Sequence, residues 1–124
     1  MVLILRKDLN MRKGKMIAQA SHAALKIFLD RAFANPEEHI LEIPITPAMV
    51  TWLNDDYKKI AVSVNSEKAL LEVYEKAQKA NIPAVIVRDH GLTEFHEEYT
   101  YTAVAIGPES EALIDPITGH LPLL

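Results

Sequence analysis

Short apolar segments alternate with helical segments along this chain, and this alternation limits its fold more than any other feature. The apolar segments are residues 2–6, 59–64, 83–87 and 100–106, each bounded by turn residues, and they predict buried strands. Strands that alternate with helices favour right-handed crossovers and a sheet covered on both faces. No helical segment separates the last two strands, so they can pair antiparallel. The sequence therefore predicts an α/β fold with a mixed sheet.

The first helix is predicted from an uninterrupted, alanine-rich stretch. Residues 15–34 contain no Gly or Pro, and Gly14 and Pro36 lie just outside the segment. Apolar side chains recur there at helical spacing, which predicts a stripe packed on the sheet. The stripe consists of Ile17, Ala20, Ala24 and Phe28. Residues 37–47 show no clear periodicity and are expected to be a connector.

Two further helices are indicated by capping residues. Thr46 followed by Pro47 is suited to begin a short helix over residues 47–54. Ser66 is suited to begin a third helix, and Asn81 is suited to end it. The predicted inward stripe of that helix is Leu70, Val73, Tyr74 and Ala77.

Length and composition limit the domain organisation. The chain has 124 residues, of which 49% are apolar, which suits one core and a single domain over residues 1–124. It has no Cys, which excludes a disulfide framework, a thiolate metal site and a thiol nucleophile. The apolar run at residues 1–5 is too short for a signal peptide or a membrane span. We therefore expect a cytoplasmic protein that does not associate with membranes.

Charge is distributed unevenly along the chain. The formal net charge of −4 argues against a nucleic-acid partner, yet residues 1–15 hold five basic groups and one acid, a local sum of +4. Residues 89–124 hold seven acids and no Lys or Arg. The basic cluster precedes a helix N-terminus, whose N–H groups and dipole suit a phosphate. From charge and position alone, a phosphate site and an ordinary solvated turn remain equally open.

Polar residues with possible chemical roles lie on the first helix and beyond the strand ends. Lys15, Gln19, His22 and Lys26 share one helical face by their spacing. A lone His such as His22 is more often a packing residue than a catalyst. In such sheets functional groups gather at loops beyond strand ends, here residues 8–15 and 89–98.

Asp89 directly follows the third strand, and Thr93 lies four residues further on. A carboxylate there can orient a water that a neighbouring hydroxyl holds. The alternative is that Asp89 only caps its own turn. The His and acidic residues over 89–98 match no established metal signature, so we predict no metal and no cofactor.

Two blocks of sequence resemble a known family. Residues 6–24 read Arg-Lys-Asp-Leu-Asn-Met-Arg-Lys-Gly-Lys-Met-Ile-Ala-Gln-Ala-Ser-His-Ala-Ala. The second block comprises Pro83, Arg88, Asp89, Gly91, Thr93, Thr102, residues 105–108, Asp115, Thr118, Gly119 and Leu121. Both blocks resemble the archaeal and eukaryotic type of peptidyl-tRNA hydrolase. The resemblance extends over nearly the entire chain and is weakest between residues 35 and 58.

The resemblance implies a fold, an activity and a set of site residues. It implies a three-layer α/β/α domain with a four-stranded mixed sheet that has one antiparallel strand. It also implies hydrolysis of the ester between an N-blocked peptide and the 3′ ribose of tRNA, and a homodimer. The catalytic residues are then expected to be Lys15, His22, Asp89, Thr93 and Thr102, with substrate binding by Arg12, Lys13 and Gln19.

Each of these residues has an expected role under the resemblance. Asp89 is expected to orient or deprotonate the water, and Lys15 to offset the developing anion. Thr93 and Thr102 are expected to bind the water or the carbonyl. Gln19 and His22 would hold or tune the lysine and the carboxylate.

The chain departs from the family pattern near Thr93. Leu92 and Glu94 replace a basic or small residue and a Gln, and Glu-Glu-Tyr at residues 97–99 replaces the usual Pro-Gly with one extra residue. The acidic residues Glu94, Glu97 and Glu98, close to Asp89 in the sequence, are expected to repel phosphate. Two alternatives therefore stay open, namely a non-catalytic module that binds tRNA or a protein, and a hydrolase of a smaller acyl substrate.

Overall fold

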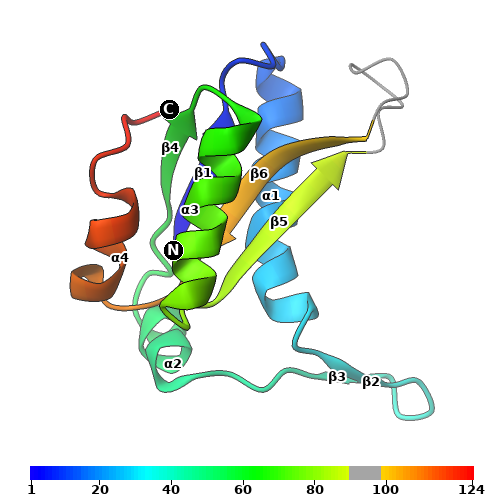
Figure 1. Cartoon of the computed structure of the whole chain (residues 1–124). Coiled ribbons are helices and arrows are strands. Elements are labelled where there is room, and N and C mark those ends of the chain that lie inside the picture. The colour runs from blue at the N-terminus through cyan, green and yellow to red at the C-terminus, as the bar shows by residue number, and fades with distance from the viewer. Residues whose placement is uncertain (90–98) are drawn as a thin grey trace.

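A four-stranded sheet lies at the centre of the computed structural model, which describes residues 1–89 and 99–124 (Figure 1). Its strands are β1 (Val2–Arg6), β4 (Ile60–Val64), β5 (Ala84–Asp89) and β6 (Thr100–Ile106), in the order β4-β1-β6-β5. β1 and β4 are parallel, and β6 is antiparallel to both β1 and β5. The predicted mixed sheet with one antiparallel strand is confirmed.

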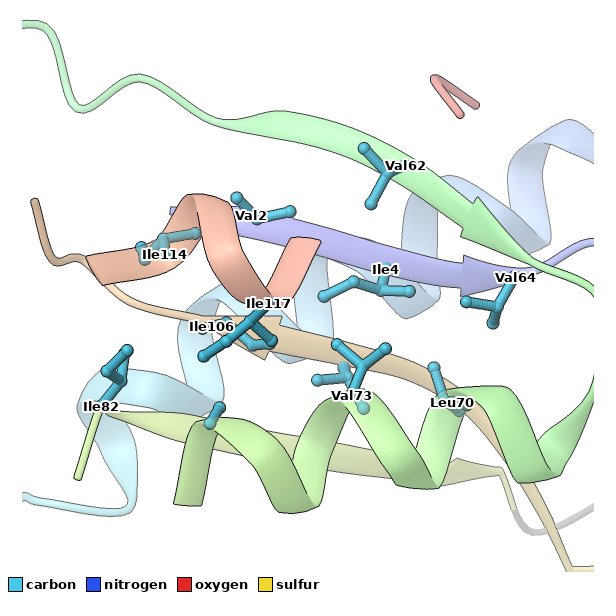
Figure 2. Close-up of a cluster of buried hydrophobic side chains, with 12 residues drawn as sticks. Val2, Ile4, Val62, Val64, Leu70, Val73, Ile82, Ile106, Ile114 and Ile117 are labelled. Atoms are coloured by element: carbon cyan, nitrogen blue, oxygen red, sulfur yellow. The ribbon is translucent and has the colours of Figure 1, made fainter. Parts of the chain in front are cut away.

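Helices cover both faces of this sheet. They are α1 (Lys13–Leu29), α2 (Pro47–Asn54), α3 (Glu67–Lys79) and α4 (Glu111–Thr118). Because side chains alternate along a strand, β1 contributes to two cores. Val2 and Ile4 pack with α3 and α4, as Figure 2 shows, whereas Leu3 and Leu5 pack with α1 and α2. The result is the predicted three-layer α/β/α arrangement in one compact domain.

The predicted caps of α2 and α3 form as expected. The Thr46 hydroxyl accepts a hydrogen bond from the Met49 N–H at 3.1 Å, and the Ser66 hydroxyl accepts one from the Ala69 N–H at 3.0 Å. Asn81 follows α3 with a φ of 55°, the left-handed conformation that ends many helices. These termini are local features, which explains why the sequence predicted them.

The segment between α1 and α2 differs from its prediction. The first helix ends at Leu29 rather than near residue 34, and β2 (Phe33–Asn35) pairs antiparallel with β3 (Ile40–Glu42). This hairpin reaches away from the central sheet (Figure 1). The prediction of a connector was therefore wrong for residues 40–42, because strands of three residues are too short to show a period.

The end of the chain also contains an element that the sequence reasoning did not predict. Helix α4 follows β6 and packs Ile114 and Ile117 onto the face that α3 covers. Pro116 lies inside this helix, and a proline normally indicates a helix boundary rather than an interior. Within the described ranges, no helix is both long and apolar enough to cross a membrane.

The predicted apolar stripe of α1 was partly wrong. Ile17 is 67% exposed, whereas the fully buried positions are Gln19, Ala23 and Ile27, spaced four residues apart. The helix is therefore rotated relative to the prediction and turns a polar carboxamide toward the sheet. A buried carboxamide requires a hydrogen-bond partner, and Thr102 provides it.

Candidate active site

The start of α1 meets the end of β5 at one edge of the sheet. β1 and β5 run in the same direction because each is antiparallel to β6, so the loops that follow them lie at the same edge. There the Lys15 ammonium donates a hydrogen bond to Asp89 Oδ1 at 2.7 Å. Each side chain is 13% exposed, so water screens this ion pair only in part. Two predicted site residues that are distant in sequence are thus in contact.

A buried hydrogen bond lies beside this ion pair. Gln19 is one helical turn beyond Lys15, and the Thr102 hydroxyl donates to Gln19 Oε1 at 2.6 Å. Thr102 is fully buried on β6, and its Oγ1 is 3.4 Å from the Val87 carbonyl oxygen. Because the hydroxyl holds the carboxamide oxygen, the Gln19 amide nitrogen faces away from Thr102 with two N–H donors.

Part of the N-terminal basic cluster is neutralised within the fold. Arg6 donates to both carboxylate oxygens of Asp8, at 3.2 and 2.7 Å, and to the Tyr101 carbonyl oxygen at 3.1 Å. The hydrogen bonds from the Arg6 guanidinium hold the pKa of the Asp8 carboxyl below its usual value. The pair therefore contributes stability above the usual carboxyl pKa, and the contribution is lost as the pH falls through the lowered value.

The exposed charge at this edge comes from fewer residues than the sequence indicated. Arg6 and Lys15 are ion-paired with Asp8 and Asp89. Arg12 is the N-cap of α1 and Lys13 its first residue, and both are exposed at the end of the helix that carries Lys15. The exposed basic side chains of the predicted +4 cluster are thus Lys7, Arg12 and Lys13.

Two further predicted site residues, His22 and Thr93, are not among these contacts. His22 is exposed on α1, and its imidazole forms no hydrogen bond with the part of the chain that the structure describes. Thr93 lies outside the described residues, as do Leu92 and Glu94. Among residues 1–89 and 99–124, no group of three or more His, Asp or Glu side chains could hold a metal ion.

Sequence reasoning missed the pairing of Arg6 with Asp8. Its signal was the spacing Arg-x-Asp at the end of a buried strand, where a charged side chain needs a counter-ion. It also missed that Gln19 contacts Thr102 rather than the lysine or the carboxylate. The signal for that contact was the position of Gln19 four residues before Ala23 and eight before Ile27, on the row that α1 buries.

Removing the Thr102 hydroxyl should destabilise the fold. Thr102→Val keeps the side-chain shape but leaves the buried Gln19 oxygen without a donor, which costs about 1–3 kcal/mol in the free energy of unfolding. Urea unfolding of the variant and of the wild type measures this difference. Thr102→Ser retains the hydroxyl and should lose much less; an equal loss in both variants would show that the methyl group matters and the hydrogen bond does not.

A double variant separates stability from turnover. Replacing both partners of a buried hydrogen bond by apolar groups can be nearly neutral, so Gln19→Leu combined with Thr102→Val should recover part of the lost stability. Turnover of N-blocked aminoacyl-tRNA, the substrate type that the resemblance implies, should not recover, because leucine lacks the N–H donors of the Gln19 carboxamide. Recovery of turnover together with stability would mean that Gln19 has only a structural role.

The fold is of the α/β class, and the side chains at this edge of the sheet are of the types that a hydrolase uses. A carboxylate can orient or deprotonate a water, and a lysine ammonium and carboxamide N–H groups can stabilise an oxyanion. An exposed, basic helix N-terminus can bind phosphate. The family model described as "Peptidyl-tRNA hydrolase PTH2" matches residues 1–124. The chain belongs to this family.

Archaeal relatives agree with this assignment over the whole chain. The peptidyl-tRNA hydrolase of Methanocaldococcus jannaschii is 48% identical over 124 residues, covering 100% of this chain and 98% of the relative. That of Methanococcus maripaludis is 41% identical and covers 98% of this chain and 96% of the relative. That of Thermococcus onnurineus is 37% identical, with coverage of 99% and 95%.

Proposed function

We propose that this protein hydrolyses the ester between an N-blocked peptide and the 3′ ribose of tRNA. The observation that carries the proposal is the Lys15–Asp89 ion pair of 2.7 Å at the edge of the sheet, beside the exposed N-terminus of α1. Family membership and the names of its relatives support the same substrate. The ester needs an activated water and a stabilised tetrahedral oxyanion, but no covalent enzyme intermediate.

In the proposed reaction Asp89 acts as the general base. Lys15 donates a hydrogen bond to Asp89 Oδ1, and the Asp89 carboxylate accepts a proton from the attacking water. The hydroxide oxygen bonds to the ester carbonyl carbon, and the carbonyl oxygen becomes the oxyanion. When the intermediate collapses, the bond to the ribose 3′ oxygen breaks, and the proton held by Asp89 passes to that oxygen. The products are the free peptide and tRNA with a 3′ hydroxyl.

The other site residues act on this intermediate. Lys15 and the Gln19 amide nitrogen stabilise the oxyanion, and Thr102 is a positioning residue that fixes the Gln19 carboxamide. Thr93 holds the water, as the resemblance implies. His22, exposed on α1 one turn beyond Gln19, contacts the substrate from the open side.

The two rival functions are distinguished by one set of assays. Turnover of N-blocked aminoacyl-tRNA, with binding of the same tRNA measured separately, tests the proposal. Binding without turnover would indicate a non-catalytic module that binds tRNA. Faster cleavage of free N-acyl amino-acid esters than of blocked tRNA would indicate a hydrolase of smaller acyl substrates.

Binding of the tRNA phosphates should depend on the exposed charge at the start of α1. Lys13→Ala should weaken tRNA binding and lower the slope of log K against log salt by about one unit, because one phosphate contact is lost. Lys68→Ala is the matched control, since Lys68 is highly exposed on α3, on the opposite face of the sheet. Equal slopes of log K against log salt for the wild type and Lys13→Ala would show that Lys13 does not contact a tRNA phosphate.

We further propose that the enzyme works in the cytoplasm, where its substrate is produced by translation, and that it forms a homodimer. The dimer is implied by the family resemblance. Sedimentation equilibrium of the purified chain tests it directly, and a mass of one chain at micromolar concentration would contradict it.

A further inference from the structure

An arginine and a tyrosine are in contact where β5 ends and β6 begins, next to the Lys15–Asp89 ion pair. The Arg88 guanidinium carbon lies over the Tyr99 ring, 4.6 Å from the ring centroid, which is the geometry of a cation–π contact. Arg88 directly precedes Asp89 on β5, and Tyr99 directly precedes β6. Because β5 is an edge strand of the four-stranded sheet, the Arg88–Tyr99 pair lies at a corner of that sheet (Figure 1).

The Arg88–Tyr99 pair and the ion pair lie on opposite faces of the same strand ends. Asp89 is paired with Thr100 in the register of β5 and β6, and its carboxylate contacts α1. Arg88 is paired with Tyr101, whose side chain packs on the core that α3 covers. Paired side chains of antiparallel strands share a face and successive ones alternate, so Arg88 and Tyr99 project on the α3 side. A molecule bound at Asp89 therefore reaches them by passing around the end of β5.

Both side chains of the pair are largely accessible to solvent. Arg88 is exposed, and Tyr99 is 62% exposed. An exposed cation–π contact adds little to the stability of a fold, so packing of the core does not account for this arrangement. The contact does hold the long arginine side chain in one place, which lowers the conformational entropy that a ligand must remove when it binds.

We propose that the Arg88–Tyr99 pair stacks on an unpaired base at the 3′ end of the tRNA. Aromatic rings and guanidinium planes are the groups on which proteins stack the bases of single-stranded RNA. The ester is on the terminal ribose, so the last bases of the strand lie within a nucleotide or two of Arg88 when the ester meets Asp89. This inference rests on the proposed function and adds a site for a base to the phosphate contacts expected at α1.

The proposed site recognises an unpaired end rather than a sequence. Every base has a π-face, so stacking tolerates any base, whereas a base inside a duplex is already stacked on its neighbours. Phosphate contacts on the α1 side and a stacked base on the α3 side would hold the strand from two sides. This would fix the position of the ester relative to Asp89, which is the geometric requirement for attack by a positioned water.

The first measurement is the binding of uncharged tRNA, which requires no hydrolysis. Tyr99→Ala should raise the Kd about 5- to 150-fold, the range expected for the loss of one aromatic stacking partner. Tyr99→Phe keeps the ring and should bind like the wild type. Tyr57→Ala is the matched control, because Tyr57 is 57% exposed and contacts the Lys59 ammonium at 5.0 Å, but precedes β4 at the opposite edge of the sheet. Circular dichroism confirms that each variant is folded.

Removal of the unpaired 3′ nucleotides from the tRNA identifies the base. The difference in Kd between the wild type and Tyr99→Ala should vanish with the trimmed tRNA, because the base that stacks is then missing for both proteins. A difference of equal size with intact and trimmed tRNA would overturn the proposed base site. Equal affinities of the wild type and Tyr99→Ala for intact tRNA would overturn it as well.

Variants of Arg88 distinguish stacking from a phosphate contact. Arg88→Lys keeps the charge but loses the planar guanidinium, so it should raise the Kd for intact tRNA about 5-fold and leave the slope of log K against log salt unchanged. Wild-type affinity in Arg88→Lys, together with a slope lowered by about one unit in Arg88→Ala, would show a phosphate contact and overturn stacking. Absence of turnover in a wild type whose tRNA binding depends on Tyr99 would overturn the proposed hydrolysis alone.

Discussion

Replacing Asp89 by Asn should lower turnover of N-blocked aminoacyl-tRNA by about 10²- to 10⁴-fold, the range that general base catalysis typically contributes. The amide keeps the shape of the carboxylate, and its oxygen can still accept the hydrogen bond from Lys15. It cannot accept a proton from water at neutral pH. Single-turnover kinetics with blocked tRNA measure the effect on the chemical step.

Asp8→Asn is the matched control for the loss of a charge. Asp8 also forms an ion pair of 2.7 Å, with Arg6, at the same edge of the sheet. Both substitutions should lower stability to a similar extent, whereas only Asp89→Asn should lower turnover by orders of magnitude. Near-normal turnover in Asp89→Asn would show that another residue is the general base, with His22 as the next candidate. Unfolding of Asp89→Asn alone would show that Asp89 is a structural turn residue.

Replacing Lys15 by Met should lower turnover by about 10²- to 10³-fold, comparable to the loss of one donor to an oxyanion. Methionine keeps an unbranched chain but provides neither a positive charge nor a hydrogen-bond donor. It also leaves the Asp89 carboxylate, 13% exposed, without the ion pair that Lys15 provides. The expected loss is therefore in kcat, with a smaller change in the affinity for tRNA.

Lys15→Arg separates the charge from the geometry. Arginine restores a positive charge, but its planar guanidinium donates in different directions from an ammonium. We expect partial turnover, above that of Lys15→Met and below the wild type. Equal turnover of Lys15→Met and the wild type would exclude Lys15 from the reaction. A loss confined to tRNA affinity would make it a phosphate ligand instead.

The burial of Thr102 changes the role that was first expected for it. The Gln19–Thr102 hydrogen bond of 2.6 Å places the carboxamide beside the lysine, yet Thr102 is fully buried and cannot reach a water at the surface. We therefore propose a positioning role for Thr102 in place of the direct water contact first expected for it. Leu92, Glu94 and the acidic residues predicted around Thr93 lie outside the described residues.

The sequence by itself determined the features that depend on neighbouring residues. The four central strands, the caps at Thr46 and Ser66, and the turn at Asn81 all follow from local composition, hydrogen-bonding side chains and backbone preference. The family motif likewise lies in one continuous stretch over residues 6–24. These features need no knowledge of which segments meet in space.

Only the tertiary structure decided which residues meet. The ion pair joins residues 74 positions apart, and it forms because β6 lies between β1 and β5 and makes them run in the same direction. The rotation of α1 was likewise set by packing, since Thr102 on β6 satisfies Gln19 and allows a polar residue in the buried row, while Ile17 turns outward. Helical periodicity alone cannot choose between two adjacent stripes, because the free-energy difference between them comes from the surface on which the helix packs.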